Sequence, residues 1–440
     1  MMKQLVVLLG MACAVHSQMS SMQKLGSSNN EFALNLYNKL NEETDGNLFF
    51  GPLSISTAMA MLYMGADGDT KTQIEQVMRY ENIGENFRET FQDLNKRLYN
   101  RNNNYTLKSA NRLFGDQQFT IKESFLTDTN TFFDAELEEV DFRADAEAAR
   151  QKINGWVKER TEGKIEDLMP EDSITSMTVL VLVNAMYFKG KWKSPFVDGA
   201  TKKGSFYTSD NDVDGIQMDF MNQQKKFQIH ENAELKVKVL ELPYEGDDLS
   251  MYVVLPDMKM GLGDIEKILN IETLETLVDT ANFEEKLVQV SLPKFEIAQK
   301  FDLRSNMAAL GMADLFSNTK ANLNGISEGA NLFVSALAHK AYVIVNEEGT
   351  EAAASTGAEV SLTSVQFPVA FKADHPFMFF VREKSSGSIV FVGRILGQPD
   401  TDAVFGGGFE GGEETKDNMA TATVASMTCV IAGVFAAMLR

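Results

Sequence analysis

The chain has 440 residues, and 62 acidic against 41 basic side chains give it a formal charge of −21 at pH 7. This surplus of negative charge argues against a nucleic-acid partner, because affinity for the phosphate backbone depends on basic side chains. Hydrophobic residues make up 44% and charged residues 23% of the chain. These fractions are typical of globular proteins, so we expect most of the chain to fold.

The first 17 residues have the pattern of a secretory signal peptide. Lys3 precedes an apolar run from Leu5 to Val15, and the small residue Ser17 ends the segment. The run is too short to span a membrane, and polar residues follow it directly. We therefore expect cleavage near Ser17 and a secreted, extracellular product.

The C-terminus carries a second processing pattern. A flexible polar spacer, residues 400–423, precedes an apolar tail, residues 424–440. Small residues, a polar spacer and a terminal apolar tail are typical of a signal for attachment of a glycosylphosphatidylinositol (GPI) anchor. We favour a GPI anchor that tethers the protein to the outer cell surface, attached at one of three glycines, Gly408, Gly411 or Gly412. A single-pass membrane anchor and a tail that only packs against the domain are the alternatives.

The cysteines and the single glycosylation sequon fit a secreted protein. Cys13 lies in the expected signal peptide and Cys429 in the tail, so the mature domain contains no cysteine. Its core must therefore stabilise it without disulfides, which a domain of this length can do. The sequon Asn104-Tyr105-Thr106 makes Asn104 the candidate glycosylation site.

Between residues 27 and 399 there is no linker, repeat or low-complexity tract, which predicts one domain. Helical spacing of apolar residues predicts helices over 31–40, 54–64, 87–98, 146–157 and 263–278. Apolar runs predict strands over 179–183, 235–242, 251–255, 287–292, 341–345 and 389–392. The strand at 235–242 alternates and should be half-exposed, whereas 179–183 and 342–345 are continuous and should be covered on both faces. Helices first and strands later predict an α+β fold.

Side chains suited to catalysis or metal binding are scarce. Without the signal peptide only His230, His339 and His375 remain, and no nucleophile and base stand at a recognisable spacing. We expect no metal site, no cofactor and no enzymatic activity, and a structural role for His339. A small basic cluster on one predicted helix should be a solvated face rather than a glycosaminoglycan site; it consists of Lys96, Arg97 and Arg101.

The most informative segment follows a predicted strand and runs to Pro368 without a core pattern. Its alternation puts small uncharged residues on one face, namely Thr350, Ala352, Ala354, Thr356, Ala358, Val360 and Leu362. This face can be buried while the opposite face of the segment stays in water. Gly349, at the base of the segment, lets the backbone fold back. The pattern therefore predicts an exposed segment that can later become a strand in the centre of a sheet. The alternative is an ordinary Ala-rich surface loop or helix.

The chain resembles the serpins over nearly its whole trimmed length. The matching blocks are residues 47–55 with 64–66, 183–192, 290–295, and 375–377 with 391–394. One further block is similar to the hinge of inhibitory members: Glu347, Glu348, Gly349, Thr350, Glu351, Ala352, Ala353, Ala354 and Ser355. The resemblance implies a single serpin domain over 27–399, with about three β-sheets, about eight or nine helices and an exposed reactive-centre loop at 347–368.

The resemblance also implies suicide inhibition. A target protease attacks the loop and forms a covalent acyl complex, and the stretch from Thr350 to Leu362 then inserts as a new central strand. The small uncharged face supports this independently, because a charge in a packed sheet would cost roughly several kcal/mol. The alternative is a non-inhibitory serpin that acts as a carrier or chaperone.

The resemblance to the serpins assigns further site residues. Ser54, Asn184 and His339 match the family's shutter, the cluster beneath the two strands that must part, and Trp192 matches its breach tryptophan. One departure is Gly51, where the family usually has a serine, so the shutter has one hydroxyl fewer.

In serpins the reactive bond lies at a set number of residues after the start of the hinge. Counted from Glu347, this bond falls between Thr363 and Ser364, with Leu362 and Val365 as neighbouring candidates. Residues 341–371 contain no Lys or Arg, which excludes trypsin-like targets. Thr363 suits an elastase-like protease. Leu362 suits a chymotrypsin-like protease or, as the penultimate residue, a papain-like cysteine protease.

Overall fold

The computed structural model describes residues 19–100, 103–329, 331–348, 367–398 and 403–405. Within these ranges the α-helices are α2 (Ser21–Asn41), α3 (Pro52–Gly65), α4 (Gly68–Met78), α5 (Phe87–Leu98), α6 (Glu123–Phe133), α7 (Ala146–Arg160), α8 (Leu262–Ile268), α9 (Ile271–Val278) and α10 (Arg304–Met307). The strands are β1 (Leu48–Phe50), β2 (Tyr105–Asp116), β3 (Leu137–Val140), β4 (Leu180–Gly190), β5 (Lys202–Phe206), β6 (Ile216–Asn232), β7 (Val237–Pro243), β8 (Leu249–Pro256), β9 (Glu284–Pro293), β10 (Phe295–Asp302), β11 (Ala336–Val345), β12 (Val369–Lys372), β13 (Phe377–Glu383), β14 (Ile389–Ile395) and β15 (Ala403–Phe405).

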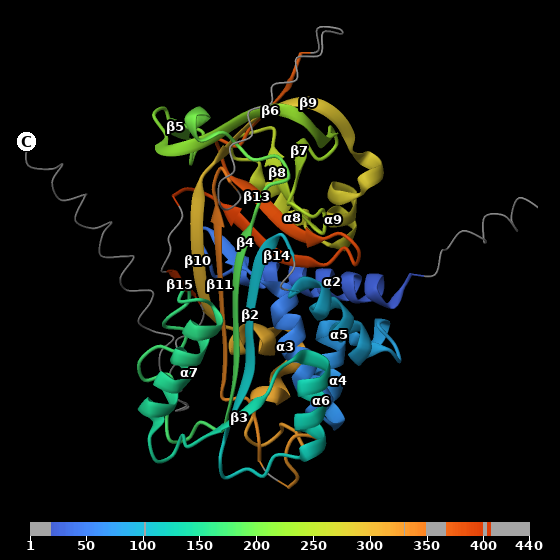
Figure 1. Cartoon of the computed structure of the whole chain (residues 1–440), viewed down its shortest axis with the longest axis vertical. Helices are drawn as coiled ribbons and strands as arrows, with labels where there is room; N and C mark the ends of the chain where they lie inside the picture. The colour runs from blue at the N-terminus through green and yellow to red at the C-terminus, as the bar shows by residue number, and fades with distance from the viewer. Residues whose placement is uncertain (1–18, 101–102, 330, 349–366, 399–402, 406–440) are drawn as a thin grey trace, which may run out of the picture.

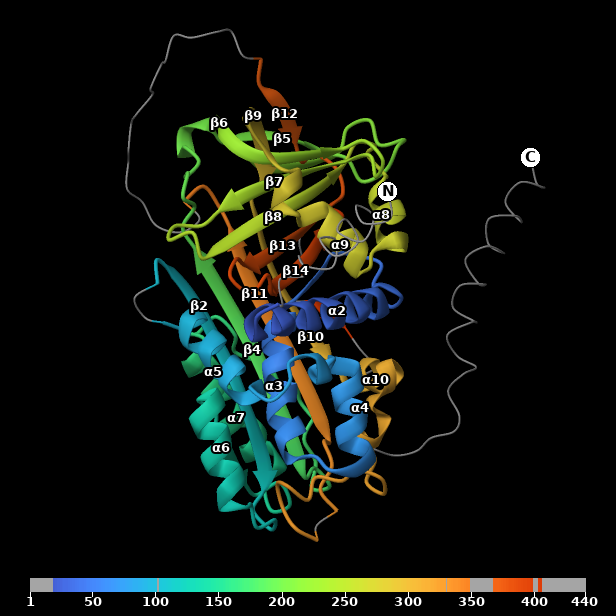
Figure 2. The same ribbon diagram turned by 90° about the vertical axis from the view of Figure 1, so that its right-hand side faces the viewer.

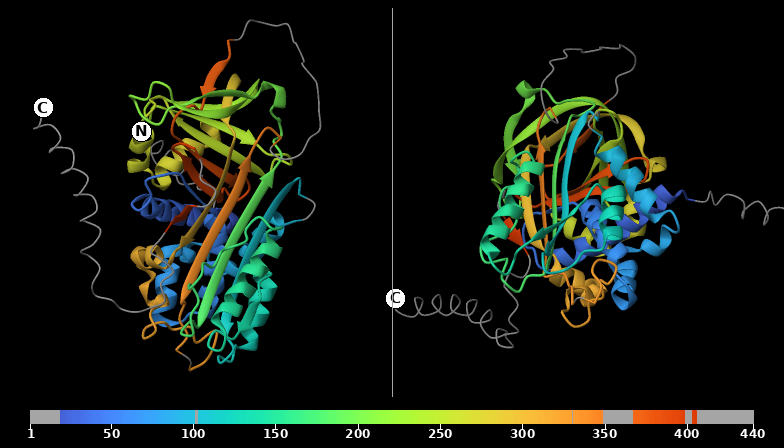
Figure 3. Two further views of the ribbon diagram at one scale, coloured as in Figure 1. Left: turned by 90° about the vertical axis from the view of Figure 1, so that its left-hand side faces the viewer. Right: turned by 60° about the horizontal axis from the view of Figure 1, so that its bottom comes forward.

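Six of the described strands form the long sheet, in the order β15-β10-β11-β4-β2-β3 (Figure 1). Its two central strands, β4 and β11, run parallel and pair directly, from Ala336 opposite Val181 to Val343 opposite Phe188. Strand β2 runs antiparallel to β4, and β10 runs antiparallel to β11. Figure 3 shows β4 and β11 side by side along the length of the molecule.

The upper sheet contains nine of the strands in the described ranges; eight follow the order β1-β14-β13-β8-β7-β6-β9-β12, and β5 pairs with β6. Strand β6 connects two parts of this sheet. It pairs with β5 and β9 along most of its 17 residues, and with β7 only at its end, from Ile229 to Asn232. The expected arrangement of about three sheets is thus present as two hydrogen-bonded networks.

Helices cover both faces of the long sheet (Figures 1 and 2). Along β4, Val181 and Val183 pack in the cluster that contains Ile153 and Val157 of α7. The alternate residues, such as Leu182, pack in the main core with the almost wholly buried helix α3. Because each face has its own cover, β4 carries a continuous apolar run.

The observed elements confirm the α+β serpin fold and most of the predicted segments. The helix at 87–98 has the predicted bounds, and residues 180–183 are buried on both faces as expected. The predicted helix at 263–278 is wrong, because it is divided into α8 and α9. Asn270 adopts an extended conformation there and caps α9 by accepting a hydrogen bond from the Thr273 N–H.

Two strand predictions also need correction. The stretch at 235–242 follows the predicted alternation only in its first half: Lys236 is exposed and Lys238 is half-buried, whereas residues 239–242 are all buried. Strand β11 begins at Ala336, five residues before the predicted start at Ala341, so His339 lies inside the strand.

Candidate functional site

A buried polar cluster lies where β4 and β11 meet. Asn184 of β4 and His339 of β11 are direct register partners, and Ser54 approaches them from α3. The Asn184 amide donates to the Ser54 hydroxyl at 2.6 Å, and its carbonyl is hydrogen-bonded to His339 Nδ1. All three side chains are at most 1% exposed. The structure therefore brings the three predicted shutter residues into one cluster.

Strand β2 contributes two residues to this cluster that sequence reasoning missed. The Ser54 hydroxyl donates to Asn111 Oδ1 at 3.0 Å and lies 3.1 Å from the Ser109 hydroxyl. The Asn184 amide also donates to Asn111. Ser109 and Asn111 are two residues apart on one strand and so share a face, a signal that alternation along 105–112 contained.

A main-chain group of Gly51 takes part in the cluster. The Gly51 N–H donates to His339 Nε2 at 3.0 Å, so the other ring nitrogen, Nδ1, carries the proton that is donated to Asn184. Burial lowers the pKa of His339 to about 3, which keeps the imidazole neutral. A β-carbon at position 51 would lie 2.7 Å from the Met186 sulfur, so Met186 occupies the space of a larger side chain there.

The predicted breach tryptophan holds the chain that leads into the hinge. Trp192 stacks on Tyr244 with ring centroids 4.5 Å apart, and its indole N–H donates to the Asn346 carbonyl at 2.8 Å. Its backbone N–H donates to the Glu348 carbonyl at 3.1 Å. The last described residues before the loop are thus fixed to the end of β4.

Glu347, the first hinge residue, is held by its side chain as well. Its carboxylate accepts a hydrogen bond from Thr201 at 2.6 Å and pairs with Lys294 at 2.8 Å. Burial raises the pKa of Glu347, but the hydrogen bonds from Lys294 and Thr201 outweigh it, so the pKa lies below its ordinary value. Sequence reasoning missed both partners, since neither stands near position 347 in the chain.

The remaining predicted sites are only partly described. Asn104 is exposed in the bend before β2, and Phe367, where the described chain resumes after the loop, is 88% exposed. The hinge from Gly349 to Ser355, the reactive-bond candidates Leu362, Thr363, Ser364 and Val365, the signal peptide, and the glycines Gly408, Gly411 and Gly412 lie outside the described residues.

Comparison with known proteins identifies the family. Residues 27–397 match the family described as serpin (serine protease inhibitor). The chain belongs to the serpin family. It is 43% identical to the human leukocyte elastase inhibitor over 379 residues, covering 85% of this chain and 99% of the relative, and 40% identical to serpin B6 of Macaca fascicularis over 376 residues, with the same coverage.

Solved serpin structures share the fold. Uncleaved ovalbumin superposes with a TM-score of 0.80 at 33% identity, covering 84% of this chain and 99% of ovalbumin. Human thyroxine-binding globulin superposes with a TM-score of 0.77 at 30% identity, covering 87% of this serpin and all of the globulin. The described helices include none long and apolar enough to cross a membrane. In the same ranges no group of three or more His, Cys, Asp or Glu side chains is placed to hold a metal.

We expect acid to destabilise this serpin partly through His339. Unfolded histidine has an ordinary pKa of about 6.5, so below that pH the unfolded chain binds a proton that the buried imidazole does not. The contribution of neutral His339 is complete above pH 6.5 and is lost as the pH falls toward 3, by up to about 1.4 kcal/mol per pH unit. Urea unfolding, followed by tryptophan fluorescence, should be measured between pH 7.5 and 5. The free energy of unfolding should fall more steeply with decreasing pH in the parent than in His339→Gln. Equal slopes of this free energy against pH would contradict the role of His339.

The ion pair at the hinge should contribute measurably to stability. Lys294→Met leaves the buried carboxylate of Glu347 without its cation and should cost roughly 2 kcal/mol in the free energy of unfolding. The matched control is Lys193→Met, which removes an exposed pair with Asp247 and should cost under about 0.5 kcal/mol. A double-mutant cycle with Glu347→Gln measures the coupling energy between Lys294 and Glu347. Additive effects of the two substitutions on the free energy of unfolding would contradict a stabilising ion pair.

Proposed function

We propose that this serpin inhibits its target protease by suicide insertion of its reactive-centre loop, residues 347–368. The observation that carries the proposal is the run of small uncharged residues directly after β11, from Thr350 to Leu362 on one face. These residues can enter the sheet between β4 and β11 facing the main core, where a charge would cost roughly several kcal/mol, whereas the opposite face of β11 is only half-covered at Lys340 and Ile344.

The chemistry needs no catalytic group from the serpin. The protease nucleophile attacks the carbonyl carbon of Thr363, and the bond to Ser364 breaks with a proton delivered to the new amino terminus. The acyl ester then links Thr363 to the protease. Insertion parts β4 from β11 and breaks the hydrogen bond between Asn184 and His339, and the protease is carried away before water can cleave the ester.

The target is an elastase-like or chymotrypsin-like protease rather than a trypsin-like one. Residues 341–371 contain no Lys or Arg, and Thr363 fits a small elastase-like specificity pocket. The name of the human relative, leukocyte elastase inhibitor, supports this choice. Leu362 keeps a chymotrypsin-like protease and a papain-like cysteine protease as further targets to test.

We also propose that the protein is secreted, glycosylated at Asn104 and tethered to the outer cell surface. The exposure of Asn104 supports glycosylation, and the terminal sequence patterns support secretion and a GPI anchor. The backbone of β15 pairs with β10 at one edge of the long sheet. Gly408 to Gly412 follow Phe405 by at most seven residues, roughly 25 Å of extended chain, so the anchor would hold the protein by this edge.

A non-inhibitory carrier is the competing function. The observation in its favour is the similarity to thyroxine-binding globulin, whose structure contains thyroxine. The hinge opposes it, because a carrier does not require small residues on the inserting face.

Substitution of the hinge separates the two functions. Ala354→Glu puts a charge on the inserting face and should convert the inhibitor into a substrate, so that detergent-stable complex with elastase or chymotrypsin falls at least about tenfold. Ala353→Glu is the matched control, because position 353 lies on the opposite face and should keep inhibition. The amount of complex is measured on denaturing gels. The released C-terminal fragment is sequenced, and its first residue should be Ser364.

Two results would contradict the proposal. Equal trapping by the Ala354→Glu and Ala353→Glu variants would contradict insertion of the loop with the Ala354 face inward, and the second result would contradict inhibition itself. The second is clean cleavage of the parent by each protease, including cathepsin L, with no complex and no gain in heat stability.

Treatment of expressing cells with phosphatidylinositol-specific phospholipase C should release the protein into the medium if a GPI anchor holds it. A chain ending at residue 407 is the control and should already be in the medium. Full-length protein that stays on the cells after treatment would exclude the GPI anchor.

A further inference from the structure

One long stretch of β2 has a free edge. Strand β3 pairs only with Leu113–Asp116, whereas β4 pairs with β2 from Tyr105 to Gly115. Along residues 105–112 every second residue therefore points its N–H and C=O away from β4. No described residue forms a backbone hydrogen bond with this edge. Edges of this kind are usually covered, because they pair readily with another chain.

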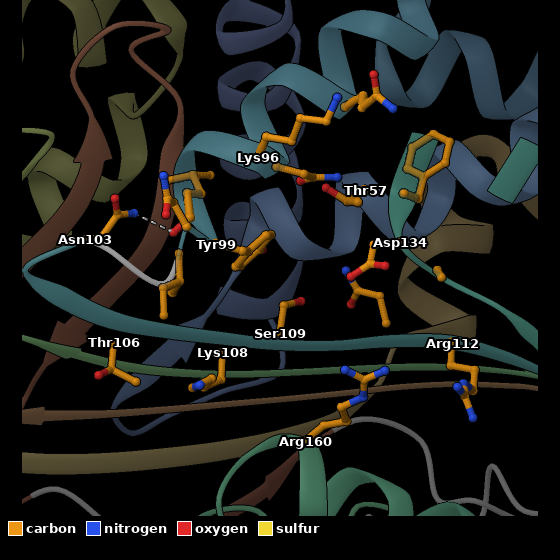
Figure 4. Close-up of a pocket in the computed structure, with 18 of the residues that line it drawn as sticks. Thr57, Lys96, Tyr99, Asn103, Thr106, Lys108, Ser109, Arg112, Asp134 and Arg160 are labelled. Carbon is orange, nitrogen blue, oxygen red and sulfur yellow. Dashed lines mark hydrogen bonds between the residues drawn. The ribbon is translucent and has the colours of Figure 1, made fainter. Parts of the chain in front are cut away.

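The free edge lies in a groove of about 1400 Å³ between β2 and helices α5, α6 and α7 (Figure 4). Tyr99 follows α5, Phe132 lies on α6, and Trp156 lies on α7, so aromatic side chains line several of its walls. The volume exceeds the roughly 300–1,000 Å³ of typical small-molecule pockets. An extended peptide of eight residues, roughly 26 Å long, matches the length of the open edge.

The groove is basic on a protein that is strongly acidic overall. Six cationic residues line it, namely Lys96, Lys108, Arg112, Arg160, Lys189 and Lys191, against the four acidic residues Asp134, Glu136, Glu159 and Glu162. Lys108 pairs with Glu162 and Arg112 with Glu136. The other four cations have no ion-pair partner among the described residues, so the groove has positive charge left to complement an anionic ligand.

We propose that an extended acidic segment of a partner protein binds in this groove by adding a strand to the free edge of β2. The backbone edge selects a peptide, because alternating donors and acceptors match those of a second strand. The unpaired lysines and Arg160 select acidic side chains on that peptide. Lys96 therefore has a role beyond that of a solvated face.

The groove also touches the polar cluster between β4 and β11. Ser109 and Asn111 line the groove and hydrogen-bond to Ser54, and Asn111 also accepts from Asn184. A partner that binds β2 in its present position stabilises the closed sheet and slows loop insertion. This regulatory effect rests on the proposed inhibitory function, whereas the binding itself does not.

The test uses the full chain with Asn104→Gln, so that no glycan covers the end of the groove. The probe is a fluorescent octapeptide of alternating glutamate and valine, and binding is followed by anisotropy. The variant Lys96→Glu with Lys191→Glu should weaken binding about tenfold or more through lost charge complementarity. The matched control carries the same charge change on exposed residues of the upper sheet, Lys202→Glu with Lys225→Glu, and should bind like the parent.

A second peptide tests strand addition itself. The same octapeptide with alternate amide nitrogens methylated cannot form the ladder and should not bind. Equal binding of the methylated peptide, or equal affinity of the groove variant and the parent, would overturn the proposal. A peptide that raises the melting temperature and abolishes inhibition irrespective of the groove charges has entered between β4 and β11 instead, which also overturns it.

Two further measurements complete the test. If light scattering shows a dimer that only the groove variant loses, a second copy occupies the groove and the partner-protein proposal is wrong. Protease trapping is measured separately, so binding of the peptide by a chain that traps no protease would leave the groove assignment intact and refute only the inhibitory function.

Discussion

The direct pairing of β4 with β11 is the constraint on which the rest of the structure depends. Parallel pairing is somewhat weaker per residue than antiparallel pairing, and this seam lies in the middle of the long sheet. At its centre the hydrogen bond between Asn184 and His339 crosses from one strand to the other. Opening the seam leaves those buried groups unpaired, at a cost of about 1–3 kcal/mol for each. The polar cluster therefore closes the sheet without making it permanently closed.

How far the fold follows from the sequence differs from element to element. Helix α5 was predicted to the residue because Phe87, Phe91, Leu94 and Leu98 repeat at helical spacing between polar residues. The break between α8 and α9 was missed because the apolar spacing continues across it, and the capping hydrogen bond of Asn270 outweighs that periodicity. The burial of residues 239–242 depends on the segments that cover both faces of β7, and alternation within one strand contains no information about what covers its faces.

The site was predictable only through the family resemblance. Ser54 and Asn184 are 130 positions apart, and Asn184 and His339 are 155 apart, so no local pattern connects them. The Gly51 position shows a further limit. A sequence shows the missing hydroxyl, but not that a main-chain N–H reaches the imidazole or that Met186 occupies the remaining space. Ser109 and Asn111 were accessible in principle, because two polar residues on one face of a strand need partners when that face is buried.

Strand β2 belongs both to the long sheet and to the groove. Its pairing with β4 extends from Tyr105 to Gly115, so under the proposed insertion, in which β4 separates from β11, we expect the two strands to move together. Ser54 on α3 is hydrogen-bonded to Asn111 and Asn184, one residue from each moving strand, and the free edge of β2 faces α5 and α6, which pack against each other. We infer that the proposed opening of the seam changes the distance between β2 and the helices across the groove. Any ligand that holds β2 against those helices acts on the seam, because the sheet and the groove share this one strand.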